Sequence, residues 1–140
     1  MNENDVIQIL LEELKSEHDI EELVSFSDID LQEKLKDNTF LIIKYKDLWI
    51  KEKIIFEQLE DKMNRLMSKR YHYYRFEQDE NLSKPEIEKY YIPGDRKILQ
   101  MKGILRKQKV RVDFFEICWK SLESVKWNMK TFSDNERRGL

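Results

Sequence analysis

The sequence has few of the residues that make tight turns, with three glycines and two prolines among 140 residues. No glycine or proline precedes Pro85. This scarcity argues against a sheet of short strands joined by tight turns, and it permits long helices. The single cysteine, Cys118, excludes a disulfide within the chain and fits a reducing compartment.

Long apolar runs are absent as well. The sequence has no run of about 18 apolar residues, which predicts that no segment crosses a membrane. The N-terminal stretch MNENDVIQIL carries acidic rather than basic residues before its apolar part, which argues against a signal peptide. These features predict a soluble intracellular protein.

The sequence also lacks the patterns of a catalytic or metal site. His18 and His72 are the only histidines, and neither lies at metal-ligand spacing from Cys118. Cys118 lies in the apolar stretch FFEICWK, which favours a buried structural cysteine over a nucleophile. Three scattered glycines cannot form a phosphate-binding loop. We therefore expect no enzyme activity, no cofactor and no metal.

What the sequence does have is charge, unevenly distributed. Charged residues make up 39% of the chain, and the formal net charge is −2. Residues 1–35 hold eleven acidic and two basic residues, whereas residues 62–76 hold five basic residues and no acid. Residues 96–112 hold seven basic residues and no acid. The near-neutral total therefore hides an acidic arm and two basic segments.

Apolar residues recur at steps of three and four along most of the chain, which predicts an all-α fold of long amphipathic helices in one domain. We expect an acidic N-terminal helix or arm within 1–26 and a long helix over 28–76. An acidic loop should follow over 77–95, with Pro85 starting a short helical turn and Asp95 capping the next helix. That C-terminal helix should cover 96–132, and 133–140 should be a polar tail.

The first basic segment combines cations with aromatic rings, in the stretch DKMNRLMSKRYHYYRF. Cations attract phosphates, and flat rings offer stacking surfaces to unpaired bases, so the combination favours single strands over duplex. Steps of three or four residues place a first set of side chains along one edge of the helix: Lys62, Arg65, Lys69 and His72. Arg70 and Tyr74 lie along the adjacent edge. The candidate DNA-binding residues are Lys62, Arg65, Lys69, Arg70, His72, Tyr74 and Arg75. Solvated helix faces are the alternative interpretation of both basic segments.

The second basic segment and the aromatic residues beyond it give two further candidate surfaces. The basic residues of 96–112 form a candidate second basic surface: Arg96, Lys97, Lys102, Arg106, Lys107, Lys109 and Arg111. The C-terminal helix carries more large apolar side chains than one helical hairpin readily buries. A candidate subunit interface therefore consists of Phe115, Trp119, Leu122 and Trp127.

The runs DLWIKEK, LEDKMNRLMSKRYHYY and KPEIEKYYIPGD, followed by a helix ending near WNMKTF, resemble the UvsY family, the recombination mediators of T-even-like bacteriophages. The resemblance covers about residues 28–134. It implies an all-helical, non-catalytic protein that assembles into a ring-like homo-oligomer, a hexamer or heptamer, through its C-terminal region.

The resemblance also implies partners and a place of action. Members bind single-stranded DNA and help the phage recombinase load onto strands covered by the phage single-stranded DNA-binding protein. These activities serve recombination, repair and recombination-dependent replication in the cytoplasm of the infected bacterial host.

The family's DNA-binding motif, Lys-Ala-Arg-Leu before a Tyr-Tyr pair, maps onto Ser68-Lys69-Arg70-Tyr71 followed by His72 and Tyr73-Tyr74. Arg70 matches the motif's arginine. Ser68 stands where the motif has lysine, and Lys69 lies one residue away, about 100° around a helix.

A second interpretation of the charge pattern remains open. Acidic residues in 1–35 and basic residues in 96–112 could pair between subunits. The protein would then be a non-catalytic helical scaffold or adaptor whose charged segments mediate protein–protein assembly.

Overall fold

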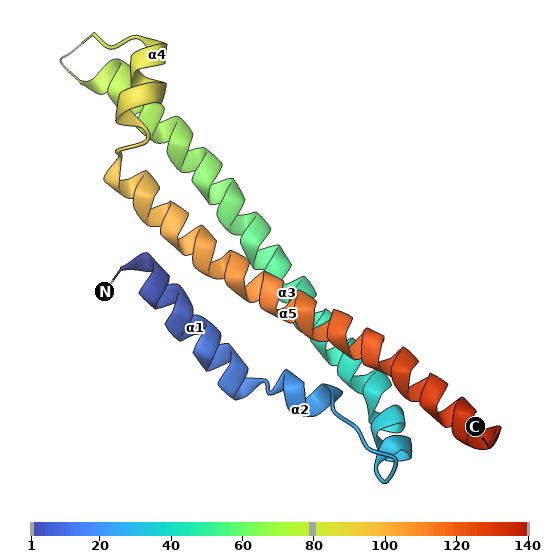
Figure 1. Cartoon of the computed structure of the whole chain (residues 1–140). Helices are drawn as coiled ribbons and strands as arrows, with labels where there is room; N and C mark the ends of the chain where they lie inside the picture. Colours follow the sequence, from blue (N-terminus) through green and yellow to red (C-terminus); the bar gives the residue numbers. More distant parts are fainter. Residues whose placement is uncertain (1, 79–80, 140) are drawn as a thin grey trace. The chain divides into compact units, whose positions relative to one another are not determined.

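The computed structural model describes residues 2–78 and 81–139, and these residues form helices and turns with no strand (Figure 1). The helices are α1 (Glu3–Glu17), α2 (Ile20–Val24), α3 (Leu31–His72), η1 (Tyr73–Glu77), α4 (Lys84–Glu86), η2 (Ile87–Tyr91) and α5 (Arg96–Arg137). The elements η1 and η2 are π-helical turns. The prediction of an all-α fold is confirmed.

The long central helix is confirmed, because α3 continues without a break into η1 and the two cover residues 31–77. The long C-terminal helix is confirmed too, and α5 ends at Arg137 rather than near residue 132. Residues 79 and 80 of the predicted loop, like Met1 and Leu140, lie outside the described residues.

The chain divides into two compact units. Unit 1 comprises Met1–Glu52 and Val110–Leu140, and unit 2 comprises Lys53–Lys109. Unit 1 therefore contains α1, α2, the beginning of α3 and the end of α5. Unit 2 contains the end of α3, the connecting elements and the beginning of α5.

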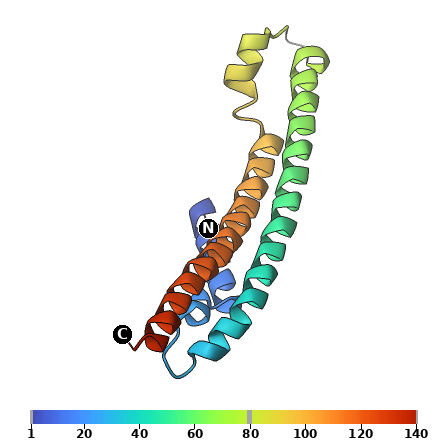
Figure 2. The same cartoon turned by 90° about the vertical axis from the view of Figure 1, so that its right-hand side faces the viewer.

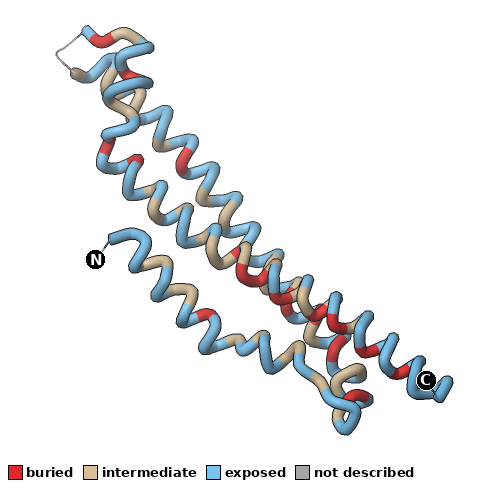
Figure 3. The backbone as a smooth tube through the Cα atoms, in the orientation of Figure 1, coloured by how far each residue is buried: buried red, intermediate tan, exposed pale blue. Residues whose placement is uncertain are grey.

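Unit 1 has a core of large apolar side chains. Buried positions recur along the C-terminal part of α5, where residues three and four apart face the same side (Figure 3). Partly buried residues of α1 and α2, among them Leu10 and Leu23, pack on this cluster and widen it. The buried members of the cluster are Leu14, Ile42, Tyr45, Phe114, Phe115, Cys118 and Leu122.

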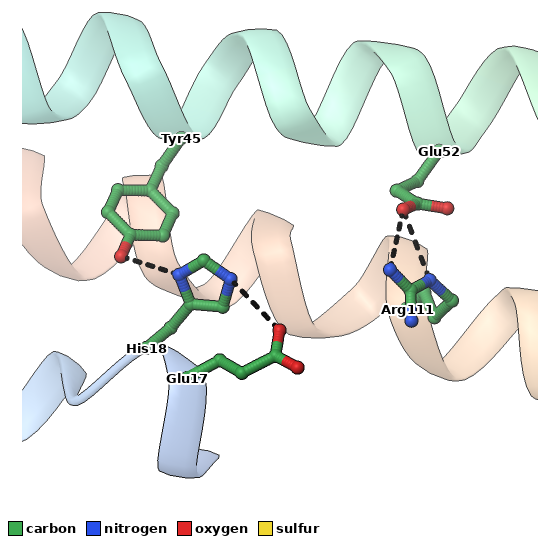
Figure 4. A network of polar contacts seen from close by, with 5 residues as sticks. All are labelled: Glu17, His18, Tyr45, Glu52 and Arg111. Carbon is green, nitrogen blue, oxygen red and sulfur yellow. Dashed lines mark hydrogen bonds and ion pairs between the residues drawn. The ribbon is translucent and has the colours of Figure 1, made fainter. Parts of the chain in front are cut away.

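Polar contacts also join the helices of unit 1, and Figure 4 shows two of them. His18, just after α1, places Nδ1 3.0 Å from the hydroxyl of Tyr45 on α3. Arg111 on α5 donates from Nε and Nη2 to Glu52 Oε1 at 3.1 and 3.0 Å. Burial, aided by the nearby positive charges of Lys44 and Arg111, lowers the pKa of His18 against the opposing effect of Glu17.

Unit 2 has a smaller apolar core, and its connecting elements are short. Figure 2 shows α4 and η2 running back beside the end of α3. The Tyr74 and Tyr91 rings lie 5.2 Å apart there. The buried apolar residues of this unit are Met63, Leu82, Ile87 and Ile98.

Local capping explains where the elements of unit 2 begin. The Ser83 hydroxyl accepts the Glu86 amide at 3.4 Å, and Pro85 lies in the first turn of α4, where its missing N–H costs nothing. Asp95 Oδ1 accepts the Ile98 amide at 3.1 Å at the start of α5. The predicted cap at Asp95 is confirmed, and Pro85 lies in the first turn of α4 but one residue after its start at Lys84.

Candidate nucleic-acid interface

Three cations form an exposed edge on the C-terminal part of α3. Lys62, Arg65 and Lys69 are all exposed, and their spacing of three and four residues places them along one side of the helix. The buried side of the same turn is occupied by Met63. We call these three residues the cationic edge. Within residues 2–78 and 81–139, Lys62 and Lys69 have no carboxylate partner, so their charges face solvent.

Arg70 lies next to the cationic edge but has a different environment. Its Nε donates to Asp95 Oδ2 at 2.7 Å, and its side chain is only 19% exposed. The guanidinium also lies 4.3 Å from the Tyr73 ring centre and 5.3 Å from that of Tyr74. The matched arginine of the family motif is therefore held inside unit 2 by an ion pair and two aromatic rings.

Asp95 is the centre of this arrangement. The Tyr74 hydroxyl donates to the same Oδ2 at 2.6 Å, and the other carboxylate oxygen caps α5. Burial by itself raises the pKa of Asp95, but the hydrogen bonds from Tyr74 and Arg70 outweigh it and lower the pKa. We call Arg70, Tyr74 and Asp95 the Asp95 cluster.

The other predicted DNA-binding residues fall into two groups. Arg75 donates from Nη1 to the carbonyl of Leu82, shortly before α4. His72 is exposed, 3.6 Å from the Glu77 carboxylate through Nδ1. The structure thus leaves His72 beside the cationic edge at the surface, while Arg75, like Arg70, contacts another part of its own unit.

An open groove of about 510 Å³ brings the two basic segments together within unit 2. It is lined on one side by α3 and η1 and on the other by Lys97 at the start of α5. The exposed ammonium groups of Lys69 and Lys97 in its lining suit a phosphate backbone. The lining residues are Leu66, Ser68, Lys69, Arg70, His72, Tyr73, Glu77 and Lys97.

The candidate second basic surface is not one continuous face. Arg111 is paired with Glu52 in unit 1, and both Arg106 and Lys109 have partners. At about 100° per residue, the cations of the segment fall on more than one side of α5. Among the described residues of unit 2, the exposed members of this surface that form no ion pair or side-chain hydrogen bond are Arg96, Lys97, Lys102 and Lys107.

The candidate subunit interface is mostly occupied within the single chain. Phe115 and Leu122 belong to the core of unit 1, and the Trp119 ring lies 5.5 Å from that of Trp49. Phe115 and Leu122 are buried and have little surface for a neighbour, and Trp119 is partly buried. Trp127, at 69% exposed, is the member of the four that faces solvent.

Catalytic or metal chemistry gains no support from the described residues. Across residues 2–78 and 81–139, no three or more His, Cys, Asp or Glu side chains are grouped so as to hold a metal ion. Burial raises the pKa of the Cys118 thiol to about 11, so the thiol is neutral near pH 7 and a poor nucleophile.

Sequence reasoning did not find the Asp95 cluster. Asp95 was expected only as a helix cap, and its ion pair joins it to a residue 25 positions earlier. The sequence did contain an acidic residue, Asp95, at an expected helix start, and an arginine, Arg70, in the first basic segment. That pattern is common in a chain with 28 acidic residues, so it does not identify the pair.

Comparison with known proteins places the chain in a family. The family model for the recombination, repair and ssDNA binding protein UvsY matches residues 19–138, nearly the whole chain. No curated protein and no solved structure gives a significant match. Among the described residues, no helix combines the length and apolarity needed to cross a membrane. The chain therefore belongs to the UvsY family of recombination, repair and single-stranded-DNA-binding proteins, whose members are non-catalytic recombination mediators.

Proposed function

We propose that the chain holds single-stranded DNA on the cationic edge of α3 and in the adjoining groove. The observation that carries this proposal is the exposure of Lys62, Arg65 and Lys69 along one side of a rigid helix. Lys97 adds a positive charge across the groove. Phosphates bind such a row by releasing condensed counterions, with little dependence on base sequence.

In this proposal the Asp95 cluster supports the site and does not contact DNA. Arg70 forms an ion pair with the buried Asp95 carboxylate, and its guanidinium lies against the rings of Tyr73 and Tyr74. A phosphate would have to compete with Asp95 for it. Lys69 therefore takes the phosphate-binding role that the family motif gives to its lysine, although Ser68 stands at the matching position.

The biological role follows from the family. The protein acts as a mediator that promotes loading of the phage recombinase onto strands covered by the phage single-stranded DNA-binding protein. It does so in the cytoplasm of the infected bacterial host, in recombination, repair and recombination-dependent replication.

We also propose that several copies assemble, as the ring-like hexamer or heptamer of the family. Unit 1 leaves large apolar side chains in solvent, with Phe40 72% exposed and Trp127 69% exposed. Ile43, also exposed, lines a groove together with Trp127. An assembly would repeat the cationic edge on every subunit, which raises the affinity for a long strand through avidity.

A salt series with two matched variants tests the proposal. Fluorescence anisotropy with a labelled single-stranded oligonucleotide should show binding that weakens steeply with salt, by a slope of about −0.7 per phosphate contacted. Lys62→Ala with Lys69→Ala should flatten that slope. Lys36→Ala with Lys51→Ala removes the same charge from exposed positions of α3 in unit 1 and should leave the slope unchanged.

The scaffold interpretation predicts a different result. If the basic segments serve assembly alone, binding to the oligonucleotide is absent at low salt, and the Lys62 and Lys69 substitutions change the oligomer size instead. Light scattering on the same samples measures that size.

A further inference from the structure

One aromatic ring near the cationic edge, that of Phe76, is not packed into the core of unit 2. Phe76, on η1, is 69% exposed. The two tyrosines before it are half-buried, and each lies against the guanidinium of Arg70. Phe76 adds little to the core, and its exposed ring follows the cationic edge by one to two turns of the same continuous helix.

The π-helical turn accounts for this difference. In a π-turn each amide bonds five residues back, so the chain holds one more residue per turn than an α-helix would. The Tyr74 hydroxyl is held by Asp95 in this turn, while Phe76 is left outside. Such turns often occur at functional sites.

Among the described residues of unit 2, His72 is the ring that contacts Phe76. The two ring centres lie 5.0 Å apart with their planes at 48°. The Glu77 carboxylate lies 3.6 Å from His72 Nδ1, and His72 lines the groove that contains Lys69 and Lys97. A flat, solvent-facing ring thus lies beside the rim of a basic groove.

We propose that Phe76, supported by His72, is the platform on which an unpaired base of the bound strand stacks. The inference rests on the proposed function, because it adds a base contact to the phosphate contacts of the cationic edge. Glu77, an acid in the groove lining, does not contact phosphate in this proposal. Stacking of this kind is tolerant of base identity, because every base has a flat face. Tyr74, the aromatic residue that the sequence favoured, has its hydroxyl bound to Asp95 and is half-buried.

The test compares a thymidine oligonucleotide with an abasic oligonucleotide of the same length, using the full-length protein. The wild type should bind the thymidine strand about 5- to 100-fold more tightly than the abasic strand. Phe76→Ala should lower affinity for the thymidine strand toward that for the abasic strand. It should leave the abasic affinity and the salt slope unchanged.

Three further variants make the interpretation specific. Phe76→Trp should retain the preference, because it keeps an aromatic face, whereas Phe76→Leu keeps apolar area but should lose it. Tyr90→Ala is the matched control, because Tyr90 is 66% exposed in the same unit but lies on η2, which contributes no residue to the lining of the groove. It should behave as wild type.

The outcomes separate this inference from the proposed function. If salt-steep binding persists and Phe76→Ala keeps the thymidine preference, the platform is disproved while the phosphate site stands. If neither strand binds, both proposals fail. If Phe76→Ala changes the oligomer size by light scattering and not the preference, the ring contacts a second copy of the chain and the platform is again disproved.

Discussion

The two units of this chain are stabilised in different ways. Unit 1 buries many large apolar side chains, with Phe115 2% exposed at the centre of its largest cluster. Unit 2 buries few and depends on a charged group, Asp95, that is 3% exposed and holds Arg70, Tyr74 and the start of α5 together. Unit 2 is also the one with the exposed cationic edge. The difference teaches that an arginine in a basic segment can belong to the fold, while its lysine neighbour is exposed to solvent.

The largest expected effect is on the core of unit 1. Phe115→Ala should lower the free energy of unfolding by about 3–5 kcal/mol, because it removes a large buried ring and leaves a cavity. Urea denaturation followed by circular dichroism measures the change. A loss below about 1 kcal/mol would mean that the ring is not buried as described.

Asp95→Ala should have the next largest effect. It removes a helix cap and leaves the Arg70 charge without its partner, which together cost about 3 kcal/mol. The pKa of Asp95 is lowered in the folded state, so its contribution to the free energy of unfolding depends on pH. This contribution is present above about pH 4 and is lost as acid protonates the carboxylate. Urea denaturation at pH 7 compares the variant with wild type.

Arg70 and Lys69 allow a comparison between adjacent residues. Arg70→Ala should destabilise the protein by about 2 kcal/mol, because the Asp95 carboxylate loses a charged hydrogen bond. Lys69→Ala should change stability by less than about 0.5 kcal/mol and weaken DNA binding. Normal stability together with lost binding in Arg70→Ala would instead make Arg70 a DNA ligand.

The smallest effect concerns His18 in unit 1. Burial lowers its folded-state pKa below the ordinary value of 6.5, so the unfolded chain takes up the proton more readily. Stability should therefore fall as pH drops through about 6.5 toward 5. His18→Gln should reduce this fall, as measured by urea midpoints at pH 7.5 and 5.5. An identical fall in the variant would assign the pH dependence to other groups.

The sequence predicted the fold well where the signals are local. Apolar spacing located both long helices, and Pro85 and Asp95 located the starts of α4 and α5. The sequence did not predict the π-helical turn η1. No local residue pattern distinguishes hydrogen bonds between residues five apart from the α-helical bonds between residues four apart.

The site was predicted only in part, because long-range contacts decide which charges remain free. The exposure of Lys62, Arg65 and Lys69 follows from their spacing around α3. The partners of Arg70 and Arg111 do not, because Asp95 and Glu52 are 25 and 59 residues away along the chain. Likewise, the burial of Phe115 depends on α1 and α2, whose packing on α5 no short segment reveals.

Photocrosslinking would test the central claim most directly. A single-stranded oligonucleotide carrying 4-thiothymidine is irradiated with the full-length protein, and the modified peptides are mapped by mass spectrometry. The account predicts adducts within residues 62–77 and around Lys97, all in unit 2. Adducts confined to residues 110–139 of unit 1 would contradict it, because the DNA would then bind on the other unit.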